Sequence, residues 1–130
     1  MLWGRDNRGA MVRVLGRCGD NATHIENRIG EPSANPYLYV AAQIHAGLDG
    51  LRRQLRAGPA TDSPYAGTAT LLPTTLGDAL DALTADAVLV RAFGAPFVDS
   101  FVRIKRAELA RHAEAADKDD WQRREYFSRF

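Results

Sequence analysis

Arginines and one glutamate stand at short, fixed spacings near the start of this chain. Arg8 and Arg13 bracket one β-prone segment, and Glu26 and Arg28 lie two residues apart in a second. Residues two apart on a strand point to the same face of a sheet. A carboxylate beside guanidinium groups can bind a divalent cation and the phosphate oxygens that the cation neutralises. This spacing is therefore compatible with a site for a metal ion and a phosphate.

Simpler interpretations of the same residues stay open. Glu26 and Arg28 alone are better explained as an ion pair on an exposed strand face. Arg13 lies inside an apolar run, residues 11–15, where a charge needs a partner. It could equally be a charge that protects an edge strand from aggregation.

Other kinds of site have weaker support. Residues 16–20 are rich in glycine but lack the lysine of a phosphate-binding loop, so we expect a plain turn. Cys18 has no histidine at a diagnostic spacing, which argues against a nucleophile. The three histidines are scattered and form no metal-ligand pattern. A group of arginines at 52, 53 and 56 fits the solvated face of a helix.

Composition and length indicate one ordinary globular domain. The chain has 130 residues, of which 45% are hydrophobic and 25% charged. Its net charge of +1 gives no reason to expect a nucleic acid or a membrane as partner. A single cysteine, no apolar run of about 18 residues and no leader-like start together predict a cytoplasmic protein.

We expect an α+β fold with an N-terminal β-hairpin followed by a mostly helical part. Residues 1–34 are predicted to hold two strands, at 10–15 and 23–29, joined by the turn at 16–21. A lone hairpin is marginal in water, so it needs a larger sheet or helices behind it.

Residues 35–130 are predicted to be helical. Asn35 and Pro36 suit the start of a long helix that ends at Gly58. Thr75 with Asp78 predicts a capping box. A short helix is expected to start at Asp86 and to stop at Gly94, and the last long helix is expected to start at Pro96.

The core is predicted between the long helix from Asn35 and the one from Pro96. Apolar residues recur on the first helix at steps of three and four, which indicates one buried stripe. The expected core residues are Ile44, Leu48, Leu51, Phe97, Phe101 and Ile104. A C-terminal aromatic cluster of Trp121, Tyr126, Phe127 and Phe130 is expected to be docked.

Three segments together resemble a known family. They are residues 7–13 (Asn-Arg-Gly-Ala-Met-Val-Arg), 25–28 (Ile-Glu-Asn-Arg) and 34–38 (Ala-Asn-Pro-Tyr-Leu). In these segments the chain is similar to the C-terminal part of the glutamine synthetase catalytic domain, and the similarity extends from Trp3 to Phe130. The resemblance implies that residues 1–130 are part of that domain.

The resemblance also implies an activity and residue roles. Glutamine synthetases use ATP and Mg²⁺ or Mn²⁺ to phosphorylate the side-chain carboxylate of glutamate, and ammonia then displaces the phosphate to give glutamine, a step of nitrogen metabolism. By resemblance, Arg8 and Arg28 are catalytic and bind glutamate, Arg13 binds the nucleotide, and Glu26 is a metal ligand. Other members of this ligase family use a different amine or a polyamine as acceptor.

Several features separate this chain from the best-known members. His24 and Asn21 stand where many or some members have Arg and Lys, and the filling between Arg8 and Arg13 suits members that act on other amines. The family's N-terminal β-grasp domain and its Glu-x-Glu metal ligands are not in these 130 residues. We therefore expect a fragment that is inactive alone and cannot form the family's homo-oligomeric ring. A non-catalytic helical module that binds a partner is the remaining alternative.

Overall fold

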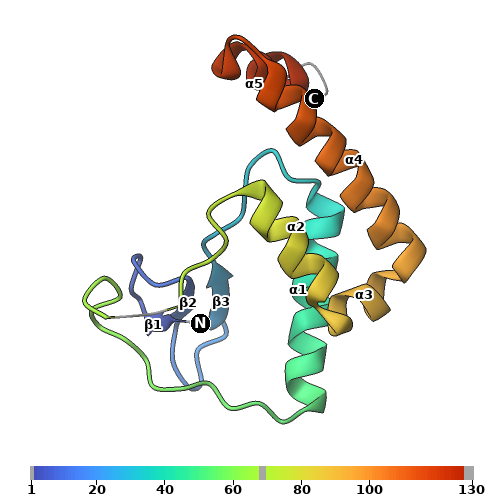
Figure 1. Cartoon of the computed structure of the whole chain (residues 1–130). Helices are drawn as coiled ribbons and strands as arrows, with labels where there is room; N and C mark the ends of the chain where they lie inside the picture. Colours follow the sequence, from blue (N-terminus) through green and yellow to red (C-terminus); the bar gives the residue numbers. More distant parts are fainter. Residues whose placement is uncertain (1, 68–69, 128–130) are drawn as a thin grey trace.

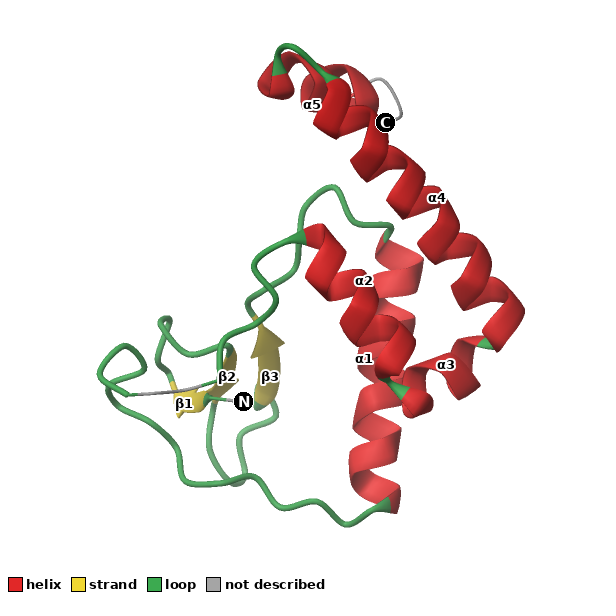
Figure 2. Cartoon of the chain, viewed as in Figure 1, coloured by secondary structure: helices red, strands yellow, loops and turns green. Residues whose placement is uncertain are grey.

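In the computed structural model, a small sheet at the N-terminal end is followed by helices. The structure describes residues 2–67 and 70–127. The strands and a long loop lie on one side, and the helices gather on the other (Figures 1 and 2). The predicted α+β class is confirmed. Within the described residues, no helix has the length and apolar character needed to cross a lipid bilayer.

The sheet has three strands in the order β1 (Trp3–Arg5), β2 (Val12–Leu15) and β3 (His24–Asn27). β2 and β3 are antiparallel and form the predicted hairpin, with shorter strands than the sequence suggested. β1 was not predicted, and it pairs with β2 in parallel. It spans only three residues with a glycine at its centre, which is too short for an alternating pattern to be visible.

The hairpin turn depends on a glycine. Gly16 has φ +84°, a backbone conformation that residues with a side chain rarely adopt. A Cβ atom there would also lie 2.5 Å from the Thr23 Oγ1 atom. Thr23 Oγ1 in turn donates a hydrogen bond to the Arg17 carbonyl at 2.8 Å, which closes the turn.

The first helix, α1 (Pro36–Arg52), begins where the sequence predicted and ends earlier. The Asn35 Oδ1 atom accepts hydrogen bonds from the N–H groups of residues 37 and 38 at 3.0 and 3.2 Å. The predicted end at Gly58 is wrong, because the chain leaves the helix at Gln54, which has φ +51°. Residues from there to Gly58 belong to the loop that returns to the sheet.

Four more helices follow α1 in the described part of the chain: α2 (Leu76–Ala85), α3 (Ala87–Phe93), α4 (Ala95–Glu114) and α5 (Lys118–Phe127). The predicted caps are present. Thr75 Oγ1 accepts a hydrogen bond from the Asp78 N–H at 3.1 Å, and the Asp86 carboxylate caps α3 at 2.9 and 3.0 Å. α3 ends at Gly94, as predicted.

The buried core lies between α2 and α4 rather than between α1 and α4. It consists of Leu80, Val98 and Val102. Five partly buried residues pack against it: Leu83, Val90, Phe93, Phe101 and Leu109. The core therefore draws on α3 as well.

The predicted core was wrong for most of its residues. Leu51 is 76% exposed, and Ile44, Leu48, Phe97 and Ile104 are exposed as well. Only Phe101 contributes to the observed core, at its margin. The stripe on α1 exists in the sequence, but α2 occupies the position against α4 that was assigned to α1. A periodic pattern shows which face of a helix is apolar and does not show what covers that face.

The C-terminal helix α5 docks on α4 through an aromatic group, as expected. Trp121 makes edge-to-face contacts with His112 at 5.2 Å and with Tyr126 at 6.3 Å between ring centroids. Glu108 is buried beneath this helix, with Lys105 Nζ at 2.7 Å and the Tyr126 hydroxyl at 3.2 Å. Two other members of the predicted cluster differ: Phe127 is exposed, and Phe130 lies outside the described residues.

The loop after α1 returns to the sheet and covers the start of β1 (Figure 1). The Thr61 N–H donates to the Trp3 carbonyl at 2.8 Å, and the Trp3 indole N–H donates to the Gly58 carbonyl at 2.7 Å. Gly4 permits this close approach. A Cβ at Gly4 would lie 2.8 Å from the Asn7 Cβ atom and 2.9 Å from the Thr61 carbonyl oxygen.

A core truncation tests the position of the core. Leu80→Ala should lower the free energy of unfolding by about 2–5 kcal/mol, because it removes a fully buried side chain and leaves a cavity. Leu51→Ala, on the exposed face of α1, should change it by no more than about 0.5 kcal/mol. Urea unfolding followed by circular dichroism measures both. Equal losses for the two variants would contradict this core.

A pair of glycine substitutions tests the docking of the loop on β1. Gly4→Ala should destabilise the sheet, because the added methyl meets the Thr61 carbonyl, which is backbone and cannot move aside cheaply. Gly47→Ala, inside α1 with nothing within 4 Å, should instead stabilise by about 1 kcal/mol. Thermal unfolding and hydrogen exchange of the β2 amides provide the measurements. A neutral Gly4→Ala would show that the loop does not press on β1.

Candidate functional site

Arg13 and Glu26 face each other across the antiparallel pair of β2 and β3. They are register partners in the β2–β3 ladder, and Arg13 Nη1 donates to Glu26 Oε2 at 3.1 Å. Arg28 follows β3 and lies two residues after Glu26. Its Nη1 atom donates to the other carboxylate oxygen, Glu26 Oε1, at 2.8 Å. Each oxygen of one carboxylate is therefore held by a different guanidinium, as expected for side chains on one face of the hairpin.

Asp6 is a second anion beside Arg13, and the sequence analysis gave it no role. Arg13 Nη2 donates to Asp6 Oδ1. Asp6 directly follows β1 and has φ +47°, and its own N–H donates to the Val14 carbonyl at 3.0 Å. The backbone therefore fixes its position at the end of β1. Arg13 is held between carboxylates from both neighbouring strands.

Arg13 remains charged in this setting. Its side chain is only 14% exposed, and a cation with so little water around it needs anions in contact. The hydrogen bond to Asp6 raises the pKa of Arg13 above its usual value, burial opposes this shift, and the hydrogen bond to Glu26 adds to it. The Arg13 Nε atom is buried and has no hydrogen-bond partner within the described ranges.

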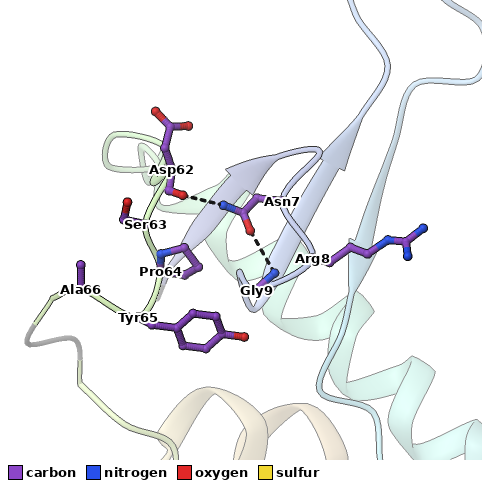
Figure 3. Close-up of a pocket in the computed structure, with 8 residues that line it drawn as sticks. All are labelled: Asn7, Arg8, Gly9, Asp62, Ser63, Pro64, Tyr65 and Ala66. Carbon is purple, nitrogen blue, oxygen red and sulfur yellow. Dashed lines mark hydrogen bonds between the residues drawn. The ribbon is translucent and has the colours of Figure 1, made fainter.

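The Arg8 side chain does not join this network. Arg8 lies in the turn between β1 and β2, and its carbonyl oxygen accepts a hydrogen bond from Arg28 Nε at 2.9 Å. Its guanidinium is directed away from the loop that carries Asp62 and Tyr65 (Figure 3). Among residues 2–67 and 70–127, it has no hydrogen bond or ion pair. The structure thus brings together Arg13, Glu26 and Arg28, and places Arg8 beside them through its main chain.

Asn7 holds the turn that carries Arg8. Its Oδ1 atom accepts from the Gly9 N–H at 2.9 Å, and its Nδ2 atom donates to the Asp62 carbonyl at 3.1 Å (Figure 3). An open hollow lies here between the turn and the loop, lined by Asn7, Arg8, Gly9 and residues 62–66. Asn7 belongs to one of the motifs of the family resemblance, but this contact with the loop was not predicted from the sequence. The available signal was that an asparagine before Arg-Gly is typical of a turn closed by its own side chain.

Glu26 can serve as one ligand of a divalent cation but cannot form a metal site by itself. A carboxylate has about four acceptor positions, and the two arginines occupy two of those on Glu26. The side chain is 36% exposed, so a cation could approach the remaining positions. Within the described part of the chain, there is no group of three or more histidine, cysteine or acidic residues that could hold a metal ion.

The charges of this network are balanced, which limits what can bind. Asp6 and Glu26 contribute two negative charges, and Arg13 and Arg28 two positive ones. A bare cation at Glu26 would meet two guanidiniums. A bare anion at Arg13 would meet two carboxylates. A cation and a polyphosphate that enter together avoid both penalties, and planar guanidiniums fit phosphate oxygens well.

The chain is similar to several curated proteins over nearly its whole length. It is 45% identical to gamma-glutamylanilide synthase of an Acinetobacter species, over 97% of this chain and 27% of that protein. It is 38% identical to human lengsin, over 96% of this chain and 25% of lengsin. Glutamine synthetase of Halobacterium salinarum is 36% identical, over 100% of this chain and 30% of the enzyme.

These relatives are much longer than the chain, which spans only about a quarter to a third of their length. The family described as "Glutamine synthetase, catalytic domain" matches residues 1–126, a range that includes all five residues of the network and its adjoining turn: Asp6, Arg8, Arg13, Glu26 and Arg28. The chain therefore belongs to the glutamine synthetase catalytic-domain family, of which it contains one part.

Proposed function

We propose that this chain supplies one wall of the active site of an ATP-dependent ligase that joins glutamate to an amine. The observation that supports the proposal is the position of Glu26, held on both oxygens by Arg13 and Arg28 in a chain of this family. Phosphoryl transfer spreads negative charge over several oxygens, and prearranged cations stabilise that charge. A rigid strand pair is a suitable platform for such groups.

Each residue has a proposed role. Glu26 is one ligand of Mg²⁺ or Mn²⁺, and the other ligands come from ATP, water and protein segments outside these residues. Arg13 binds phosphates of the nucleotide. Arg28 and Arg8 bind glutamate and the oxygens of the transferring phosphoryl group. Arg8 is free of intramolecular ion pairs within the described residues, which leaves its guanidinium available to a substrate.

A bound metal ion would neutralise negative charge on the phosphates, and the residues of this chain would position those phosphates. Because Arg28 Nε donates to the Arg8 carbonyl, the position of one arginine depends on the other. Asn7 fixes the same turn from the opposite side. We propose that this arrangement orients two guanidiniums toward one phosphoryl group, a gain that comes from positioning rather than from new chemistry.

The 130 residues alone are proposed to be inactive. Phosphoryl transfer between ATP and glutamate needs several oxygen ligands around the metal, and Glu26 provides a single carboxylate. The proposed ligase activity therefore belongs to an assembly that includes segments corresponding to the other two thirds or more of the relatives. A cytoplasmic location is part of this proposal.

Ammonia is the first candidate acceptor, and an arylamine is the second. Glutamine synthetases are among the relatives, which supports ammonia. The name of the 45% identical relative refers to the anilide of glutamate, which supports aniline or a similar amine. The segment between Arg8 and Arg13 also fits members that use other amines.

A segment exchange tests the proposed activity. This chain replaces the segment it matches in the Acinetobacter gamma-glutamylanilide synthase, and ATP- and Mg²⁺-dependent formation of γ-glutamyl hydroxamate is measured. The chimera should turn over, and Glu26→Ala should lower kcat/KM by about 100-fold or more because a metal ligand is lost. The chain alone should give no turnover above the blank.

Glu114→Ala is the matched control, because Glu114 is an exposed glutamate at the end of α4, far along the chain from the sheet. It should leave activity unchanged. A chimera that elutes like the parent enzyme but is inactive would contradict the proposal, as would equal activity of Glu26→Ala and Glu114→Ala. The Halobacterium salinarum glutamine synthetase serves as a second host if the first chimera does not fold.

A comparison of acceptors separates the two candidates. The active chimeras in both hosts are assayed with ammonia and with aniline at equal concentrations. If residues of this chain choose the acceptor, both hosts should change toward the same amine. If each host keeps its own preference, the acceptor is chosen outside these 130 residues, and the proposal of an acceptor for this chain is withdrawn.

A further inference from the structure

We propose that Asp6 is a positioning residue that occupies one edge of the Arg13 guanidinium until the phosphates of a nucleotide displace it. The inference rests on the proposed role of Arg13 as a phosphate-binding residue. It adds a residue that no role in the family resemblance covers. Some contacts of Arg13 are fixed and others can exchange.

Two of the three side-chain nitrogens of Arg13 donate hydrogen bonds to carboxylates. Nη1 donates to Glu26 and Nη2 donates to Asp6, while Nε is buried without a partner in the described ranges. A phosphate binds a guanidinium best through two adjacent N–H groups. The Nη2 N–H that donates to Asp6 belongs to one such pair, so a phosphate that binds through this edge of the guanidinium requires Asp6 to leave.

Of the two carboxylates on Arg13, Asp6 is the one that can exchange. Glu26 is fixed from both sides, by the strand register and by a second hydrogen bond from Arg28. Asp6 is 75% exposed and its side chain makes no other hydrogen bond within the described residues. An ion pair with one partner so exposed contributes little stability. Loss of the Asp6 contact is therefore the easier way to open Arg13.

The backbone at Asp6 allows the side chain to leave without unfolding the turn. The residue is held at φ +47° by the hydrogen bond from its N–H to the Val14 carbonyl, which does not involve the carboxylate. Rotation about χ1 alone moves the carboxylate away from Arg13. Phosphate oxygens close to Arg13 would repel the Asp6 carboxylate, which favours that rotation.

This arrangement would make Arg13 selective. A ligand with a single negative charge gains little when it displaces Asp6 from Arg13, because one negative charge then replaces another. A polyphosphate has several negative charges, so its attraction to Arg13 can also offset the free energy needed to move Asp6. Asp6 would therefore reduce the affinity of Arg13 for all anions, and the reduction would matter most for ligands of low charge.

Titration of the purified chain with inorganic tripolyphosphate tests this inference. The side-chain Nε–H signal of Arg13, assigned by its loss in Arg13→Lys, reports binding by NMR at constant ionic strength. Asp6→Asn should bind tripolyphosphate about two- to fivefold more tightly than the unchanged chain, the range for an exposed ion pair. Asparagine also accepts a positive φ, so the turn should persist.

Asp99→Asn is the matched control, since Asp99 is an exposed aspartate on α4 and the substitution changes net charge equally. It should leave the affinity unchanged. Asp6→Gly also tolerates positive φ and should tighten binding like Asp6→Asn. A merely structural Asp6 would give weaker binding when replaced, so the sign of the change separates the two roles.

Three results would overturn the inference: equal affinity of Asp6→Asn and Asp99→Asn, weaker binding of both Asp6 variants, or no shift of the Arg13 signal at any tripolyphosphate concentration. The titration needs no turnover. An inactive chimera in the assay above would therefore leave this result standing. Equal affinities of the Asp6 and Asp99 variants would likewise leave the proposed ligase function standing.

Discussion

Arg13 is a cation with little access to water in a sheet of three short strands, and such a charge requires anions in contact with it. Glu26 meets that requirement from β3 and Asp6 from the end of β1. The side chain of Arg13 therefore links all three strands by contacts other than the backbone ladder. Arg28 donates a hydrogen bond to the Glu26 carboxylate, and its Nε atom donates another to the Arg8 carbonyl. The candidate site exists because this one charge has to be compensated.

The helices contribute to this site indirectly. Their own core, around Leu80, Val98 and Val102, lies away from the sheet, between α2 and α4. One connection between the two parts is the loop after α1, whose backbone carbonyls accept hydrogen bonds from Trp3 and Asn7. A second is the hydrogen bond from Asn27 Nδ2 of β3 to Gln43 Oε1 of α1 at 2.7 Å. Gly4 and Gly9 allow that loop to approach closely. The turn that carries Arg8 thus depends on a segment about fifty residues later in the sequence.

Features that depend on neighbouring residues were predictable, and features that depend on distant ones were not. Asn35, Thr75 and Asp86 cap helices because their side chains reach amides two or three residues away. The pairing of Arg13 with Glu26 could be anticipated because a single hairpin brings them together. The resemblance to the family rested on short, local motifs, and the match of the family to residues 1–126 confirms it.

The core and β1 could not be predicted in this way. The stripe on α1 is genuine, but the choice between α1 and α2 as the partner of α4 depends on packing that periodicity does not contain. β1 gains its strand conformation from pairing with β2, and Asp6 becomes a partner of Arg13 only after that pairing. The role of Asp6 was therefore hidden in the sequence although its neighbours Asn7 and Arg8 were recognised.

Glu26 and its two arginines are proposed to form a surface that binds a metal ion together with a polyphosphate. Paramagnetic broadening by Mn²⁺–ATP tests it most directly in the chain as it is. NMR signals of residues in β2 and β3 around Arg13, Glu26 and Arg28 should broaden first, and Glu26→Gln should abolish this broadening. Broadening that is unchanged in Glu26→Gln, or that is strongest at acidic residues of α5, would show that Glu26 and its arginines do not bind the metal–nucleotide complex.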